Sequence, residues 1–194
     1  MLHIMTPLYR FENLQKVYNS ISDKPDIVWH IAKSNLRENI EWEVLTTDHR
    51  IVLYNVDCAD HEIYIKRNTV FENIKDGYFC LLDDDTLMHE SMYAKYLDCV
   101  KIDFKGMLVG QQLDWEDKLR LTANKPEYCK IDTGNVLCFH ACLKECRWPS
   151  THIEGVNHKD SLFWQSVCRF YHNEYSVWHQ PISYYNKLIE RYSG

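Results

Sequence analysis

Short apolar runs alternate with amphipathic stretches along the first half of the chain. An apolar run of a few residues predicts a β-strand, and apolar residues that recur every three or four positions predict a helix. Strands are expected at residues 2–5, 27–31, 42–45, 51–56 and 78–82, and helices at residues 12–21 and 67–74.

The second half continues the pattern with more strands in succession. A helix is expected at residues 90–100, and the most strongly amphipathic helix at residues 160–171; strands are expected at 106–109, 119–121 and 136–139, with a further helix from residue 141. Alternating strands and helices predict an α/β fold with a mainly parallel, doubly wound central sheet flanked by helices. Such sheets bind ligands beyond the carboxyl ends of their strands.

The run at residues 78–82 is uninterrupted and apolar, which is typical of a central strand buried on both faces, and three aspartates follow it directly. Their mutual repulsion costs stability unless a cation or hydrogen bonds compensate it. Because alternate side chains of an extended segment share a direction, Asp83 and Asp85 are expected to face one way and Asp84 the other. We expect Asp85 and Asp83 to hold a metal, with Asp83 near a ribose and Asp84 bridging or supporting. The alternative is a polar turn that caps the helix near Glu90.

Length and charge narrow the range of functions. The chain has 194 residues, of which 45% are hydrophobic, and this suits a single domain with one core. The net charge of −6, without any run of like charges, argues against a nucleic-acid or anionic-membrane partner. No apolar stretch has the length of a membrane span and no leader is visible, so we expect a cytoplasmic protein.

The cysteine pattern agrees with this location. None of the eight cysteines forms a Cys-x-x-Cys pair, and most lie in apolar segments, so we expect reduced, mostly buried thiols. The trio Cys138, Cys142 and Cys146 has helical spacing but no clear fourth ligand except His140, which favours a structural role over a zinc site.

Several motifs in order along the chain carry a resemblance. The chain resembles the metal-dependent GT-A glycosyltransferases, most of all the inverting β-1,3-glucuronyltransferase family, and by its size the small GT-A domains of large algal viruses that glycosylate capsid protein. The resemblance implies one Rossmann-like GT-A domain over residues 1–194, with a nucleotide-binding half (1–100) and an acceptor-binding half (101–194). The motifs are His3-Ile4-Met5-Thr6-Pro7-Leu8-Tyr9-Arg10, Arg67-Asn68 and residues 78–86, then, more weakly, residues 106–110, 131–135, 160–162 and 177–179.

The resemblance also implies roles for individual residues around a UDP-sugar donor. Residues of the first loop would lie around uracil and ribose, two arginines near the base or the phosphates, and a late histidine on the diphosphate. The acidic triplet would hold Mn²⁺ or Mg²⁺ with the donor. These residues are Thr6, Pro7 and Tyr9 for uracil and ribose, Arg10 and Arg67 for the base or phosphates, His179 for the diphosphate, and Asp83, Asp84 and Asp85 for the triplet.

Three carboxylates are candidates for the acceptor side. The resemblance places the catalytic base on Asp160, where the family has Glu, and an acceptor contact on Asp132. Glu154 is a weaker alternative, because it lies in the stretch 148–159, which is expected to form a mobile loop. Without the resemblance, Asp160 is a favourable helix-start residue and Asp132 a turn former. Trp115 and Trp148 are candidate platforms for sugar rings.

The implied function is metal-dependent, inverting transfer of a sugar from a UDP-sugar to a hydroxyl of a glycan or glycoprotein. The chain is shorter than the family and lacks its membrane anchor, so the sugar and the acceptor are not carried over. Two alternatives remain. A nucleotidyltransferase normally has a glycine-rich loop after the first strand, where this chain has Thr6-Pro7-Leu8-Tyr9-Arg10. A non-catalytic nucleotide- or sugar-binding module has the same fold and is not excluded by fold alone.

Overall fold

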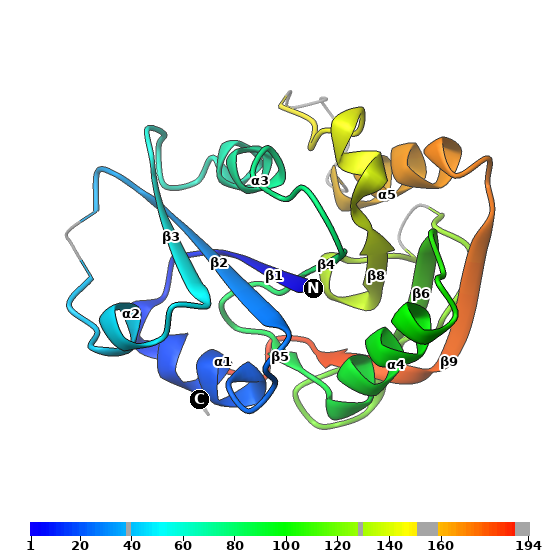
Figure 1. Ribbon diagram of the computed structural model, residues 1–194, viewed down its shortest axis with the longest axis horizontal. Coiled ribbons are helices and arrows are strands. Elements are labelled where there is room, and N and C mark those ends of the chain that lie inside the picture. The colour runs from blue at the N-terminus through cyan, green and yellow to red at the C-terminus, as the bar shows by residue number, and fades with distance from the viewer. Residues whose placement is uncertain (38–39, 128–129, 151–158, 189–194) are drawn as a thin grey trace, which may run out of the picture.

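The computed structural model describes residues 1–37, 40–127, 130–150 and 159–188. These residues form one curled, mainly parallel nine-stranded sheet in the order β3-β2-β1-β4-β8-β6-β9-β5, with β7 paired to β6 (Figure 1). The strands are β1 (Leu2–Pro7), β2 (Ile27–Ser34), β3 (Ile51–Val56), β4 (Tyr78–Leu81), β5 (Leu87–Met88), β6 (Met107–Leu113), β7 (Leu119–Leu121), β8 (Val136–Phe139) and β9 (Tyr175–Tyr184).

The parallel part of the sheet positions the predicted site. β3, β2, β1 and β4 run parallel to one another, so their carboxyl ends meet at one edge. β8 pairs antiparallel with both β4 and β6, and β9 runs parallel to β6. The acidic triplet follows β4 at the edge where the loop after β1 also lies. This confirms the predicted α/β fold and the predicted place of the triplet.

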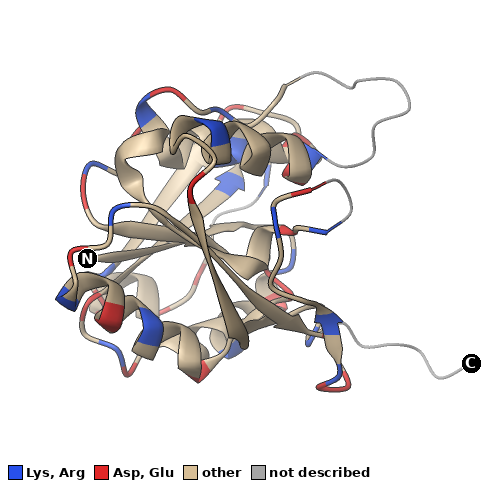
Figure 2. Cartoon of the chain, turned by 90° about the vertical axis from the view of Figure 1, so that its right-hand side faces the viewer, with Lys and Arg blue, Asp and Glu red and all other residues tan. Residues whose placement is uncertain are grey.

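Helices cover both faces of the sheet (Figures 1 and 2). In Figure 2 the strands are mostly uncharged, and charged residues lie mainly on the helices and loops around them. α1 and α4 contribute to one apolar core and α3 and α5 to the other. The helices are α1 (Leu14–Ile21), α2 (Val44–Thr47), α3 (Ile63–Phe71), α4 (Glu90–Lys101) and α5 (Lys159–Phe170), with 3-10 segments η1 (Phe11–Asn13), η2 (Thr133–Asn135) and η3 (His140–Lys144).

The central strand β4 shows why its sequence is continuously apolar. Phe79 and Leu81 belong to the core under α3 and α5, while Tyr78 and Cys80 belong to the core on the opposite face. Every residue of β4 is therefore buried, and polar residues become possible only where the strand ends.

Two expected elements differ from the structure. The strand expected at residues 42–45 is wrong: α2 begins at Val44, and the Trp42 ring packs edge-on against Tyr18 and Trp29, with ring centroids 5.6 and 6.0 Å apart. The helix expected at 67–74 begins earlier, at Ile63. Lys66 and Arg67 are buried on its inner face, so its buried side does not look apolar in the sequence.

Other differences concern the second half. The helix expected from residue 141 is the short 3-10 segment η3, and the two strands β5 and β9 were not expected as strands from their apolar pattern. Most of β9 is only partly buried, so it lacks the apolar run that marks β4. The seven described cysteines are free and buried, as expected; Cys129 lies outside the described residues. Over the described part of the chain, no helix has the length and apolar character needed to span a membrane.

Candidate functional site

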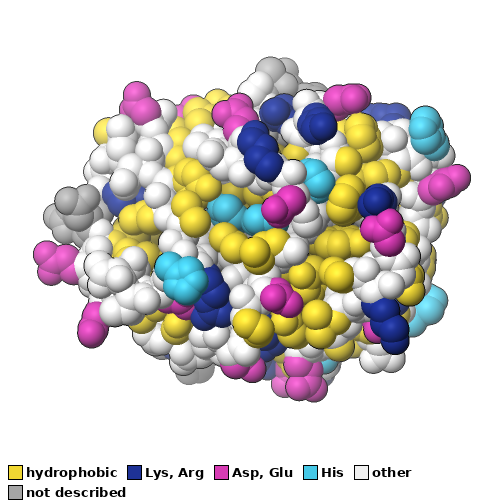
Figure 3. Space-filling view, viewed as in Figure 1, with side chains coloured by type: hydrophobic (Ala, Val, Ile, Leu, Met, Phe, Trp, Pro, Cys, Tyr) yellow, Lys and Arg dark blue, Asp and Glu magenta, His cyan; other side chains and the backbone are white. Residues whose placement is uncertain are grey.

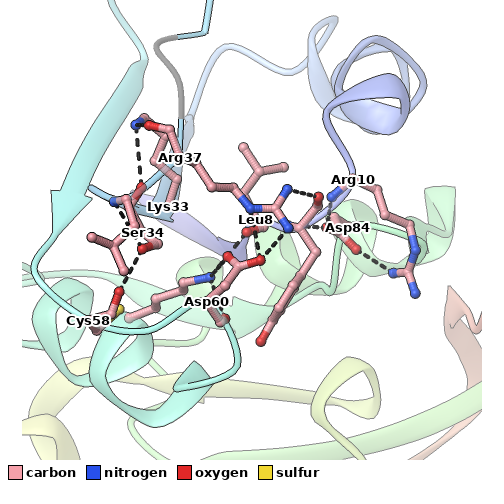
Figure 4. A network of polar contacts seen from close by, with 11 residues as sticks. Leu8, Arg10, Lys33, Ser34, Arg37, Cys58, Asp60 and Asp84 are labelled. Carbon is pink, nitrogen blue, oxygen red and sulfur yellow. Dashed lines mark hydrogen bonds and ion pairs between the residues drawn. The ribbon is translucent and has the colours of Figure 1, made fainter.

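The loop after β1 is held by a buried aspartate. The backbone N–H groups of Tyr9 and Arg10 donate to Asp84 Oδ2 over 2.5 and 2.6 Å, and Arg10 Nη1 donates to Asp84 Oδ1 over 2.8 Å (Figure 4). Asp84 is 2% exposed, and both of its oxygens are used inside the protein. Asp84 thus supports the loop after β1, which is one of the two roles expected for it, and its part in binding a cofactor stays a prediction.

A second group of charged side chains, Lys66, Asp60 and Arg37, also holds the loop after β1. Lys66 Nζ donates to Leu8 O over 3.2 Å and to Asp60 Oδ1 over 3.0 Å, and it lies 4.2 Å from the centre of the Tyr9 ring. Arg37 Nε donates to Asp60 Oδ2 over 2.8 Å, and Arg37 also contacts the Tyr9 carbonyl (Figure 4). Although burial alone would raise it, these bonds hold the pKa of Asp60 below its usual value.

Sequence reasoning missed Arg37, Asp60 and Lys66, which together with Asp84 form a group that we call the loop network (Arg37, Asp60, Lys66 and Asp84). A signal was present in the chain order. Arg37 and Asp60 follow β2 and β3, and the carboxyl ends of parallel strands share one edge of the sheet. Lys66 had no such signal, because a charged residue inside a helix normally faces solvent.

Thr6 and Pro7 do not lie open to a ligand. Both are buried within β1, and Thr6 Oγ1 accepts a 2.9 Å hydrogen bond from Trp29 Nε1. The Thr6 hydroxyl is used to join β1 to β2, and the place of Thr6 and Pro7 around uracil and ribose stays a prediction. Tyr9 and Arg10 are the partly exposed residues of this loop.

Arg67 joins the triplet to the predicted base. Its Nη2 donates to Asp83 Oδ1 over 2.8 Å, and its Nη1 lies 3.5 Å from Asp160 Oδ1. The guanidinium stacks over Trp148 at 4.0 Å from the ring centre, and the residue is 3% exposed. Trp148 stacks on Arg67 and Phe163 and is 3% exposed. It is therefore not an open platform for a sugar ring, in contrast to the prediction.

The two predicted catalytic carboxylates, Asp132 and Asp160, lie close enough for each to shift the pKa of the other. Asp132 caps η2 by accepting from Thr133 N over 2.6 Å, and its other oxygen contacts Arg120 Nη1. Burial would raise the pKa of Asp132, but the charge and hydrogen bond of Arg120 hold it below its usual value. No pattern in the sequence pointed to Arg120 as a residue of this site.

The pKa of Asp160 is shifted in the opposite direction to that of Asp132. Burial and the nearby Asp132 and Asp83 raise the pKa of Asp160 to about 7, against the lowering effect of Arg67. Thr133 completes the link to the triplet, because its Oγ1 donates to Asp83 Oδ2 over 3.3 Å. Residues from α3, the end of β4, η2 and α5 therefore meet in one place.

Asp85 is 7% exposed, whereas Asp83, Asp132 and Asp160 are partly exposed. Arg10 Nη1 lies 2.9 Å from Asp85 Oδ2, and Thr86 Oγ1 donates to Asp85 Oδ1 over 3.3 Å. Burial and the charge of Asp83 raise the pKa of Asp85 to about 6. No set of three or more His, Cys, Asp or Glu side chains in the described part of the chain is arranged to hold a metal.

The remaining predicted residues lie elsewhere or are not described. His179 is an exposed residue within β9 and contacts none of the described residues of the triplet, so its role on a diphosphate stays a prediction. Trp115 is 39% exposed in the turn between β6 and β7. Glu154 and most of the expected mobile loop, residues 151–158, lie outside the described residues.

Comparison with known proteins shows the fold. No protein-family model and no curated protein matches the sequence. The structure is similar to S. aureus TarS, with a TM-score of 0.70 and 12% identity over 94% of this chain and 36% of that one. TarS 1-349 in complex with UDP gives a TM-score of 0.73 and 11% identity over 94% and 59% of the two chains, and its complex with UDP-GlcNAc gives 0.69 and 11% over 94% and 57%.

This chain therefore spans less than two thirds of the length of each of these structures. At this level of identity the likeness establishes a GT-A-like, Rossmann-like fold of the kind found in nucleotide-sugar glycosyltransferases, and it gives no assignment to the glucuronyltransferase family.

Proposed function

We propose that this chain is a metal-dependent glycosyltransferase that moves a sugar from a UDP-sugar to a hydroxyl group of a glycan or glycoprotein, with inversion at the sugar carbon. The observation that carries the proposal is the position of Arg67. It brings Asp83, predicted to bind the donor, beside Asp160, predicted to be the base, at the ligand-binding edge of the sheet.

The donor side is supported by the loop after β1. TarS, which shares this fold, has been crystallised with UDP and with UDP-GlcNAc. In this chain Tyr9 and Arg10 are partly exposed at the edge of the sheet formed by the carboxyl ends of its parallel strands. The loop network fixes the backbone of these two residues. We assign Tyr9 to the nucleoside and Arg10 and Arg67 to the base or phosphates, with His179 on the diphosphate.

The donor set fits Mn²⁺ or Mg²⁺. Both ions prefer carboxylate oxygens and take substrate phosphate and water as further ligands, so two protein carboxylates suffice. Asp85 and Asp83 would hold the ion, and the repulsion that raises the pKa of Asp85 would be relieved by a positive charge there. When bound, the metal would stabilise the negative charge that develops on the departing diphosphate.

The acceptor side supplies a carboxylate with a suitable pKa. A general base works best when its pKa lies near the working pH, and Asp160 has a pKa of about 7. Asp160 would take the proton of the attacking hydroxyl, while Asp132, kept charged by Arg120, would hold Asp160 or the acceptor. Inversion requires this attack to come from the side of the sugar opposite the diphosphate.

A transfer assay tests the proposal. The protein is incubated with individual UDP-sugars, with Mn²⁺ or with EDTA, and the release of UDP is measured with and without a mixed glycan acceptor pool. We expect release for at least one UDP-sugar, increased by acceptor and abolished by EDTA. Binding of UDP without release from any UDP-sugar would favour the non-catalytic module, and release of pyrophosphate from UTP with a sugar phosphate would favour a nucleotidyltransferase.

A further inference from the structure

A cavity of about 200 Å³ lies at the opposite end of β4 from the acidic triplet. It opens between the end of α3 and the segment η3. One of its lining residues, His140, contacts the carbonyl of Gly77, which directly precedes β4. From Gly77 to Asp83 the extended chain covers roughly 20 Å. The lining residues are Phe71, Glu72, Ile74, Lys75, His140, Leu143, Lys144 and Arg147.

Three cations around this cavity have no carboxylate partner among the described residues. Lys75 Nζ contacts the Glu72 carbonyl, and Arg147 Nη1 contacts the Leu143 carbonyl and donates to the Cys146 carbonyl over 3.0 Å. These bonds use only part of the donor capacity of either group, since an ammonium has three N–H groups and a guanidinium five. Lys144 is exposed and uses none of its donors within the described structure.

Among the described lining residues these three cations outnumber the carboxylates, because Glu72 is the one acidic residue of the lining. Asp76 and the exposed Glu145 are close in sequence but are not lining residues. His140 Nδ1 faces the Gly77 carbonyl at 3.2 Å, which leaves its Nε2 for another partner. In the space-filling view, Lys and Arg side chains gather at the top of the face that carries the N-terminus, over the region of α3 and η3 (Figure 3). This local excess contrasts with the net charge of −6 of the whole chain.

The floor of the cavity is apolar and firmly packed. Phe71, Ile74 and Leu143 are between 1 and 3% exposed and belong to the core under α3 and α5. A ligand there would meet hydrocarbon below and several N–H donors at the rim, which is the usual composition of a small-molecule site.

We propose that this cavity is a second binding site, which takes the phosphate group of a small organic phosphate, with Lys75, Lys144 and Arg147 as its donors and the apolar floor under the organic part. Charge-assisted bonds from several cations suit a dianionic phosphate. Its distance from the triplet makes it independent of the donor site, so a ligand here and a nucleotide at Asp83 can be bound together.

An amide NMR titration tests the proposal. The labelled protein is titrated at low ionic strength with phenyl phosphate and, separately, with inorganic phosphate. We expect shifts at Gly77 and at residues 144–147, with phenyl phosphate binding more tightly than inorganic phosphate because of the apolar floor. Equal affinities would overturn the organic part of the assignment, and shifts absent from this region would overturn the site.

Variants separate this site from non-specific charge attraction. The double variant Lys144→Ala/Arg147→Ala is expected to bind phenyl phosphate about tenfold more weakly, and Glu72→Gln about twofold more tightly, because a like charge is removed. The matched control Lys101→Ala/Arg169→Ala removes two exposed cations elsewhere and is expected to leave the affinity unchanged. Equal losses in both double variants would contradict the proposal, and UDP binding, tested in parallel, does not depend on it.

Discussion

Asp60 of the loop network differs from two members of the neighbouring carboxylate cluster (Asp83, Asp85, Asp132 and Asp160): its pKa is shifted in the direction opposite to those of Asp85 and Asp160. In the loop network, Arg37 and Lys66 hold the pKa of Asp60 below its usual value. In the cluster, burial and like charges raise the pKa of Asp85 to about 6 and that of Asp160 to about 7. The two cations beside Asp60 keep it charged and fix the loop, whereas the further carboxylates close to Asp85 and Asp160 leave both side chains able to bind a proton, or a cation in its place.

The largest expected effect is on sugar transfer, and it tests the role of Asp160 in the carboxylate cluster. Asp160→Asn keeps the size of the side chain but removes the base, so transfer is expected to fall by about 10²–10⁴-fold. The dissociation constant of UDP, measured by calorimetry with Mn²⁺, is expected to stay within about twofold, because Asp160 does not face the loop after β1. The control Asp98→Asn changes an exposed residue of α4. Undiminished transfer in Asp160→Asn would remove Asp160 as the base.

The next effect is on the stability of the fold, and it tests the loop network. Lys66→Met deletes a fully buried ammonium and leaves the Leu8 carbonyl and one Asp60 oxygen without their donor. Breaking such a buried pair is expected to lower the free energy of unfolding by about 3 kcal/mol in urea denaturation. Lys16→Met, on the exposed face of α1, is expected to change it by less than about 0.5 kcal/mol. If both variants were equally stable, the loop network would not be holding the loop.

The smallest effect concerns pH. Because the pKa of Asp85 is raised from 3.8 to about 6, its protonated form favours the folded state below about pH 4, and this contribution is lost as the pH rises through 6. Asp85→Asn mimics the protonated form. Its free energy of unfolding relative to the parent is expected to rise by roughly 2–3 kcal/mol between pH 4 and pH 7 without metal. A difference that is independent of pH would contradict the raised pKa.

The sequence predicted the parts of the site that follow from strand order. A fully apolar strand followed by three aspartates placed the triplet at the ligand edge. Asp132 and Asp160 came as candidates from the resemblance to the GT-A glycosyltransferases, and in the structure Arg67 joins Asp160 to Asp83. Such inferences hold because side-chain burial on both faces of a central strand leaves a clear pattern in the sequence.

The sequence could not predict contacts that depend on packing between distant elements. Thr6 looks like a loop hydroxyl, but its bond to Trp29 is visible only once β1 and β2 are paired. Lys66 and Arg67 look like exposed helix charges, although both are buried against loops from other strands. Trp42 lies in an apolar stretch that suggests a strand, yet its ring fills a gap between α1 and β2.

Calorimetric titration of UDP with and without Mn²⁺ tests the central claim most directly, because it asks whether Asp83 and Asp85 bind the donor through a metal. We expect the parent protein to bind UDP much more tightly with Mn²⁺ than with EDTA, and Asp85→Ala to lose this difference while remaining folded. Binding of UDP to Asp85→Ala that equals the parent's and does not depend on metal would contradict the assignment of the acidic triplet.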